Sequence, residues 1–189
     1  MIFRSYDMHG RTRIKDRRNF LVLLLIISVI SMACSFEQFE PGIDKNKFAK
    51  LNASALAVKT SIDAGAGYQQ VADNAKILAD EIKTMKYAAA SKREKRLLEA
   101  YSDLLVIYRD GLLLWEYRDY FPHLAPELKG RIYVAQDVEP IIEKYRFSTE
   151  SHVYKPTGQK WRSLPADSVR IVWQNADDQL VIINNITNY

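Results

Sequence analysis

The sequence predicts an all-α protein, an up-and-down helical bundle of about four to five helices with an irregular loop near residues 148–165. Apolar residues recur every three or four positions through most of the chain after residue 44, which is the spacing of amphipathic helices. Glycine and proline, at 7 and 6 of 189 residues, are too rare to interrupt these segments often. With 48% hydrophobic and 26% charged residues, the composition is that of a folded globular chain rather than a disordered one.

The first helix is expected to start at Asp44, a good N-cap residue, with Ile43 and Phe48 placed as a hydrophobic staple. Its apolar face is narrow and consists of Phe48, Leu51, Ala55, Val58 and Ile62. Residues 64–67, with the sequence Ala-Gly-Ala-Gly, then interrupt the pattern. Because each glycine costs about 1 kcal/mol in a helix relative to alanine, this segment is either a break or a place where another helix crosses closely.

Two longer helices follow. The second has an apolar stripe over more than five turns, made of Tyr68, Val71, Ala75, Leu78, Ile82, Met85 and Ala89. The third runs from about Lys92 to Phe121, with a stripe of Leu97, Tyr101, Leu104, Tyr108, Leu112 and Trp115. Further leucines widen this face, which indicates a central helix contacted on two sides, and Gly111 in its middle fits a close crossing.

The C-terminal third is less regular. Residues 127–147 are expected to be mostly helical, with Pro140 either kinking that helix or starting a new one. Residues 148–165 are interpreted as a polar loop and as the recognition surface, because long loops often carry function. Residues 168–189 fit either a helix or a β-hairpin. We favour the helix, because its stripe closes on Ala176 and an isolated hairpin would have no sheet to join.

The N-terminal segment has the three parts of a cleavable signal peptide. A basic region ends at Arg17-Arg18, and the 14 apolar or small residues 20–33 follow it. As a helix these would span only about 21 Å, short of the ~30 Å hydrocarbon core of a bilayer. We therefore expect residues 1–33 to be removed, residues 34–43 to form a tether and residues 44–189 to form a single helical domain.

The segment Ser31-Met32-Ala33-Cys34 contains the only cysteine and resembles the lipobox of bacterial lipoproteins, with Ser31 standing where that family usually has leucine. The resemblance implies cleavage before Cys34 and attachment of fatty acyl chains such as palmitate to it, and two or more chains hold a protein stably on a bilayer. Ser35, rather than aspartate, implies sorting to the outer membrane, facing the periplasm. Arg17-Arg18-Asn19-Phe20-Leu21 also resembles the twin-arginine export motif, so both the general and the twin-arginine routes stay open.

Charge argues against a nucleic-acid partner. Residues 1–33 hold six of the 27 basic and two of the 23 acidic residues, which leaves 21 of each in residues 34–189. The net charge of +4 therefore belongs to the expected signal peptide. A local basic cluster is interpreted as a solvated turn between helices; it comprises Lys83, Lys86, Lys92, Arg93, Lys95 and Arg96.

Residues with catalytic potential are few. The sequence contains no glycine-rich phosphate loop, no Cys-x-x-Cys and no His-x-x-x-His, so no metal, no cofactor and no catalytic residue is expected. His123 could serve as a general base with Glu127 or Asp119, but a turn histidine without a function is the simpler interpretation. Aromatic side chains are the other candidates, and the possible recognition surface comprises Trp115, Tyr120, Tyr154 and Trp161.

These observations predict a lipid-anchored binding protein, an adaptor or accessory subunit of the bacterial cell envelope. Its expected partners are the bilayer, through acylated Cys34, and a protein or cell-wall component. One alternative is an envelope hydrolase with a cleft near His123 and residues 148–165. Another is a small-ligand carrier, which would need an apolar cavity of at least about 300 Å³ inside the bundle.

Overall fold

The computed structural model describes residues 42–120, 129–154 and 156–188. Residues 41–189 form one compact unit, which contains all the described helices and strands. The expected signal peptide, Cys34 and His123 lie outside the described residues. Within the described residues the chain forms five helices and one three-stranded antiparallel sheet, so the fold is mostly helical but not all-α as predicted.

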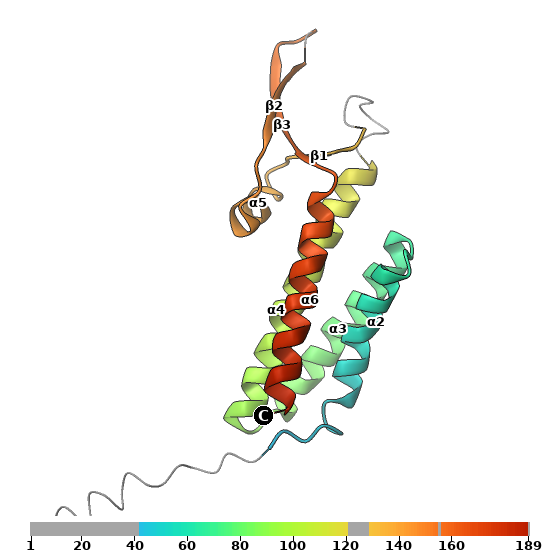
Figure 1. Ribbon diagram of the computed structural model, residues 1–189, viewed down its shortest axis with the longest axis vertical. Coiled ribbons are helices and arrows are strands. Elements are labelled where there is room, and N and C mark those ends of the chain that lie inside the picture. The colour runs from blue at the N-terminus through green and yellow to red at the C-terminus, as the bar shows by residue number, and fades with distance from the viewer. Residues whose placement is uncertain (1–41, 121–128, 155, 189) are drawn as a thin grey trace, which may run out of the picture. The chain divides into compact units, whose positions relative to one another are not determined.

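Four of the helices run alternately in opposite directions (Figure 1). They are α2 (Ala49–Asp63), α3 (Tyr68–Ala88), α4 (Lys92–Tyr120) and α6 (Ser168–Asn188). Two side-chain hydrogen bonds show that α4 and α6 are antiparallel. Arg93 Nη2, at the start of α4, donates to the Ile186 carbonyl near the end of α6 at 3.4 Å, and the Ala100 carbonyl, farther along α4, accepts from Gln179 Nε2, which comes earlier in α6, at 2.9 Å. The predicted up-and-down order therefore holds for these four helices.

The first helix starts later than predicted. Asp44 does not cap α2. Its carboxylate accepts hydrogen bonds from the backbone N–H groups of Asn46 and Lys47 at 3.0 and 3.4 Å, so it caps a turn that precedes the helix. Phe48 occupies the N-cap position of α2 without a side-chain cap. Of the two alternatives for residues 64–67, the structure shows the break between helices, because α2 ends at Asp63 and Gly65 adopts a left-handed φ of 67°.

Gly111 of α4 lies directly against the side chain of Trp173 on α6. A Cβ atom at this position would overlap the indole ring of Trp173 on α6. The close crossing predicted from a glycine in the middle of the long helix is therefore confirmed. The tail of the chain is the helix α6, as favoured, and not a hairpin.

The region between α4 and α6 differs most from the prediction. Residues 127–147 contain the short strand β1 (Arg131–Tyr133) and the seven-residue helix α5 (Glu139–Tyr145), which Pro140 starts rather than kinks. The expected loop at 148–165 is a hairpin of β2 (Glu150–Tyr154) and β3 (Gln159–Pro165). Both strands are short, and a single strand gives too few periods to be recognised by alternation alone.

The sheet has the order β1-β3-β2, so β3 is central. Its register pairs Ile132 with Leu164 and His152 with Trp161. Because side chains alternate between the two faces of a sheet, paired residues share a face. Ile132 and Leu164 are fully buried against the ends of α4 and α6, and they fix which face turns inward.

Two clusters of buried apolar residues hold the unit together. The helical core joins α2, α3, most of α4 and the second half of α6. The sheet core joins the end of α4, the start of α6, α5 and the inner face of the sheet. Three partly buried side chains pack against both clusters, and we call them the junction residues: Ile107, Trp115 and Trp173.

Candidate functional site

The side chains on the face of the sheet opposite Ile132 and Leu164 form the best candidate for a recognition site. We call this surface the aromatic face, and it consists of Arg131, Tyr133, Glu150, His152, Tyr154, Gln159, Trp161, Ser163 and Pro165. Tyr133, His152 and Trp161 are half-buried, whereas Tyr154 is 46% exposed. The aromatic face therefore combines a packed part with a part that solvent reaches.

Three rings lie against one another on this face. The His152 imidazole stacks on the Trp161 indole with centroids 4.1 Å apart and an interplanar angle of 23°. On the other side of β3, the Tyr133 ring lies 6.4 Å from Trp161 at 32°. Offset stacking at such distances is favourable, and it gives Trp161 neighbours on both adjacent strands.

A buried serine holds the imidazole in place. Ser163 is fully buried, and its Oγ shares a hydrogen bond of 2.8 Å with His152 Nε2. The same Oγ accepts a hydrogen bond of 3.1 Å from Arg131 Nη1, and Arg131 also forms an ion pair with Glu150. Since both the ring stack and these hydrogen bonds fix His152, the orientation of the ring follows from the register of all three strands.

The Ser163–His152 pair has the distance of a nucleophile and its base, but its surroundings do not fit catalysis. A nucleophilic serine must be reached by a substrate, and Ser163 is fully buried. Its oxygen is already engaged by both Arg131 and His152. The arrangement fits a brace for the aromatic face better than a reacting group.

The structure separates the residues of the predicted recognition surface. Tyr154 and Trp161 lie on the aromatic face, as neighbours across β2 and β3. Trp115 does not. It is a junction residue that packs edge-on against Tyr68 at 6.0 Å, and its Nε1 donates to Asp119 at 2.6 Å. Tyr120 ends α4, but its side chain lies outside the described residues, as do His123 and the lipidation residue Cys34.

The sequence pattern does not identify Arg131, Tyr133, His152 or Ser163 as parts of one site, and His152 and Ser163 lie in the expected loop at 148–165. Arg131 and Tyr133 were placed in an expected helix. One signal could have found the hairpin: Gly158, with φ of 71°, stands between two segments that contain β-branched and aromatic residues. A hairpin turn there would have paired His152 with Trp161.

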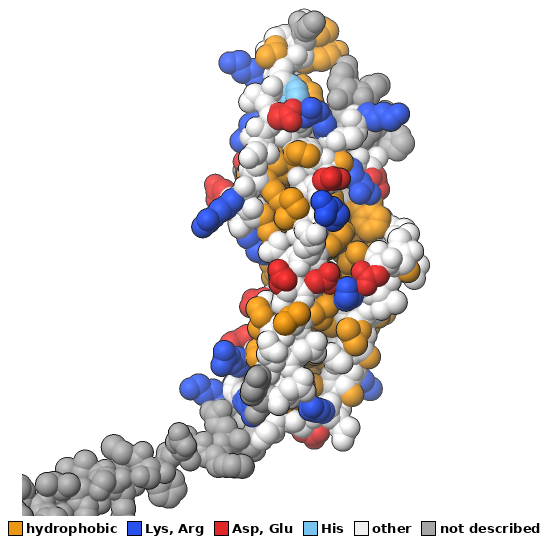
Figure 2. Space-filling view, in the orientation of Figure 1, with side chains coloured by type: hydrophobic (Ala, Val, Ile, Leu, Met, Phe, Trp, Pro, Cys, Tyr) orange, Lys and Arg blue, Asp and Glu red, His pale blue; other side chains and the backbone are white. Residues whose placement is uncertain are grey.

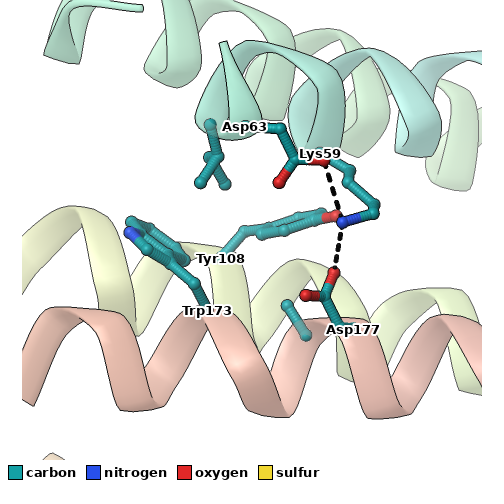
Figure 3. A pocket seen from close by; sticks show the side chains of 7 residues that line it. Lys59, Asp63, Tyr108, Trp173 and Asp177 are labelled. Carbon is teal, nitrogen blue, oxygen red and sulfur yellow. Dashed lines mark ion pairs between the residues drawn. The ribbon is translucent and has the colours of Figure 1, made fainter. Parts of the chain in front are cut away.

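A second cluster of charged side chains lies at the surface of the helical bundle, between α2 and α6 and beside α4 (Figure 3). The Nζ of Lys59 on α2 forms ion pairs with Asp63 on the same helix at 3.0 Å and with Asp177 on α6 at 2.7 Å. These hydrogen bonds, that to Asp177 first, raise the pKa of Lys59 above its usual value. Lys59 thereby ties two helices that are far apart in sequence.

Tyr108 of α4 lies beneath this ion pair, in contact with Trp173 at a ring distance of 6.4 Å (Figure 3). Burial raises the pKa of its phenol strongly, and the charges of Asp177 and Asp63 raise it further. The cavity between these side chains measures about 10 Å³, which is room for about one water molecule. Two carboxylates thus converge on a lysine, and the cavity beside them is too small for a substrate or a carried ligand.

No protein-family model matches this chain, and no curated protein or solved structure is similar to it. Among the helices that the structure describes, none is long and apolar enough to cross a membrane. In the same part of the chain, no group of three or more His, Cys, Asp or Glu side chains could hold a metal ion. The function of this protein must therefore be inferred from its own residues.

Proposed function

We propose that this protein is a lipid-anchored binding protein of the bacterial cell envelope, an adaptor or accessory subunit that contacts its partner through the aromatic face. The observation that carries the binding role is the stack of His152 on Trp161, with His152 held by a hydrogen bond to buried Ser163 on the same face of the sheet. Rings held in one orientation lose little side-chain entropy on binding, which is why rigid aromatic residues dominate recognition surfaces.

The anchor is argued from the sequence. A basic region, a short apolar segment and a small residue precede Cys34, and together they favour cleavage and acylation there. Several acyl chains on one residue tether a protein stably. Confinement to a membrane raises the effective concentration of a protein for partners in the same envelope without any new contact.

The chemistry of the aromatic face limits the partner. Its rings offer an apolar surface, while the ion pair of Arg131 with Glu150 supplies charge beside them. Such a mixture fits a partner that presents apolar and hydrogen-bonding groups together, as a protein surface or a cell-wall component does. The carrier alternative has less support, because the cavity beside Lys59 has room for about one water. The hydrolase alternative depends on His123, which lies outside the described residues, and the described Ser163–His152 pair adds no support because Ser163 is buried.

Mass spectrometry of the protein purified from its own membranes tests the anchor. We expect the chain to start at Cys34 and the thiol to carry a diacylglyceryl group. The variant Cys34→Ala should be released from the membrane fraction or keep its leader. An unmodified thiol with residues 1–33 still attached would remove the envelope assignment.

Crosslinking in native membranes tests the aromatic face. The variant Trp161→Ala should lose a crosslinked partner that the wild type recovers reproducibly. Ile77→Ala removes a 54% exposed side chain from α3 and is the matched control, which should recover the partner unchanged. Circular dichroism must show that both variants are folded. Equal recovery with all three proteins would exclude this face as the contact surface.

A further inference from the structure

The described chain enters the helical bundle at one end, which we call the tether end (Figure 1). It comprises residues 43–50, residues 83–96 and the end of α6. Lys47, before α2, forms an ion pair with Glu94 on the first turn of α4 at 2.7 Å. Lys45 Nζ donates to Asn188 Oδ1 at 2.9 Å, and Arg93 donates to the Ile186 carbonyl, so the end of α6 lies there too. The turn between α3 and α4 completes this end.

The charge of residues 34–189 is strongly polarised toward the tether end. Residues 43–50 and 83–96 hold nine of the 21 basic residues in this part of the chain but only two of the 21 acidic ones. The remaining residues of 34–189 therefore hold 12 basic and 19 acidic side chains. Figure 2 shows lysine and arginine side chains around the lower end of the bundle on the face in view. Overall neutrality conceals a basic end and an acidic remainder.

Both acidic residues of the tether end are engaged by the fold. Asp44 caps the backbone of its own turn. Glu94 is buried, and hydrogen bonds from Lys47 hold the pKa of its carboxyl below the usual value, assisted by the backbone N–H groups of Ala90 and Ser91. Lys47 thus neutralises Glu94, whereas exposed Asp44 keeps its charge, and the tether end has a net charge of +7 from its nine basic and two acidic residues.

Six cations of the tether end have no such partner. Lys45, Lys47 and Arg93 are used by the contacts described above. The others are exposed and form no hydrogen bond or ion pair with any described residue: Lys50, Lys83, Lys86, Lys92, Lys95 and Arg96. Like charges gathered on adjacent helix ends repel one another, so these six offer a surface for an external anion.

Tyr87 lies among these cations and is 92% exposed, more than any other large apolar side chain of the described residues. It is on the last turn of α3, directly after Lys86. Tyrosine placed beside lysine and arginine is the side-chain combination enriched at the boundary between water and lipid headgroups. Recognition of a nucleic-acid backbone or of acidic side chains would not by itself require an exposed aromatic ring at this position.

We propose that the tether end docks on the anionic phospholipid headgroups of the membrane. The inference extends the proposed lipid anchor, because the sequence separates Cys34 from Gly42 by only eight residues, a reach of at most about 28 Å. Lys83 and Arg96 lie within about 9 Å of the α3–α4 turn along their helices, less than the ~10 Å Debye length. A polybasic surface is a recognised second signal that strengthens a lipid anchor.

Vesicle co-sedimentation tests this surface without the acyl chains. The mature chain, residues 34–189 with Cys34→Ser, contains every buried apolar residue of the two cores. We expect it to bind vesicles of phosphatidylcholine with roughly one-third phosphatidylglycerol, to bind phosphatidylcholine alone much more weakly, and to be released by salt. The triple variant Lys86→Gln/Lys92→Gln/Arg96→Gln should bind the anionic vesicles on the order of 10- to 100-fold more weakly.

The matched control removes three cations elsewhere. Lys76, Arg109 and Arg170 are also exposed and form no ion pair with a described residue, so the variant Lys76→Gln/Arg109→Gln/Arg170→Gln has the same net charge. It should bind within a factor of about two of the wild type. Tyr87→Ala should weaken binding at high salt more than at low salt, because an apolar contact is not screened.

Three results would overturn the proposal. The two triple variants could lose affinity equally, which would show a net-charge effect without a surface. The protein could bind neutral and anionic vesicles alike. A single-stranded RNA oligonucleotide could displace the protein from vesicles at far lower concentration, which would identify a nucleic-acid surface instead. Because this protein lacks the acyl anchor, none of these results bears on Cys34, which mass spectrometry tests separately.

Discussion

The helical core and the sheet core differ in how their sequence encodes them. In the helical core, buried residues such as Leu97, Leu104 and Tyr108 recur along one helix face, so a single segment shows the pattern many times. In the sheet core, β1, α5 and β3 contribute one buried apolar residue each, which are Ile132, Ile141 and Leu164, and β2 contributes none. Periodicity identifies the first kind of core and has too little chain to identify the second.

Truncating one leucine in each core should produce the largest effects. Leu104 and Leu164 are both fully buried, so Leu104→Ala and Leu164→Ala should each lower the free energy of unfolding by about 2–5 kcal/mol. Because the junction residues pack against both cores, we expect each variant to unfold in one transition. Thermal unfolding followed by far-ultraviolet circular dichroism and by tryptophan fluorescence measures this.

Non-coincident transitions would break this view of the molecule. If the tryptophan fluorescence of Leu164→Ala changed at a much lower temperature than its circular dichroism, the sheet core would unfold independently of the helical core. The exposed substitution Ile77→Ala serves as the control and should change stability by less than about 0.5 kcal/mol.

The sequence predicted the four long helices because each repeats its apolar stripe over several turns. It also located the break at Ala64–Gly67 and the close approach at Gly111, since glycine has few reasons to be in a helix interior. It failed between α4 and α6, where Val134, Val138, Ile141 and Tyr145 imitate a helical stripe but belong to a strand's end, a turn and a short helix. Only contacts with the ends of α4 and α6 decide that these residues form separate elements.

The sequence predicts only part of the candidate site, because the site is built from short strands that show no repeated pattern. Tyr154 and Trp161 were chosen as exposed aromatic residues, and the structure places both on the aromatic face. Their neighbours Tyr133 and Ser163 come from other strands, and strand register is not visible in a single sequence. Trp115 lies apart from them and packs against both cores, because an aromatic residue near a helix end can equally well close a core.

Adding a methyl group at Gly111 should produce the next largest effect, and this substitution tests the junction between the two cores. The added methyl group of Gly111→Ala would overlap the Trp173 ring, which is held between Tyr108 and Trp115. We expect the free energy of unfolding to fall by about 1–3 kcal/mol, despite the better helix propensity of alanine. Denaturant unfolding measures the change.

Gly67 provides the matched control, because a Cβ atom there meets nothing within 4 Å and its φ of −67° suits alanine. Because Gly67 is the N-cap of α3, where glycine is preferred to alanine, Gly67→Ala should lower stability only slightly, by about 0.5 kcal/mol and less than Gly111→Ala. Should Gly111→Ala be as stable as the wild type, the ring of Trp173 would have room to move, and the two cores would be less tightly joined than their contacts indicate.

Tyr101 tests the polar side of the helical core, with a smaller effect. Its hydroxyl donates to Asn52 Oδ1 at 3.1 Å, and burial raises the pKa of the phenol to about 12. At neutral pH, Tyr101→Phe should cost about 1 kcal/mol through the lost hydrogen bond. A raised folded-state pKa stabilises fully below the unfolded value of about 10, and this contribution is lost as pH rises from 10 to 12. The variant should therefore lose stability less steeply over that range than the wild type, whereas Tyr87→Phe, at a 92% exposed phenol, should follow the wild type.

The ion pair of Lys59 with Asp177 should have the smallest effect, because both side chains are partly exposed and water screens them. Lys59→Met keeps the aliphatic part of the side chain and should lower the free energy of unfolding by about 0.5–1 kcal/mol at low salt, and by less at high salt. Lys76→Met, at an exposed lysine of α3 without a described partner, should change nothing. A double-mutant cycle with Asp177→Asn isolates the pair, and a coupling free energy near zero would mean that α2 is held on α6 by apolar contact alone. The repeated apolar stripe would then outweigh this ion pair in joining the helices, and the contrast with the sheet, whose strands are also joined by the Arg131–Glu150 pair and Ser163 on the aromatic face, would become sharper.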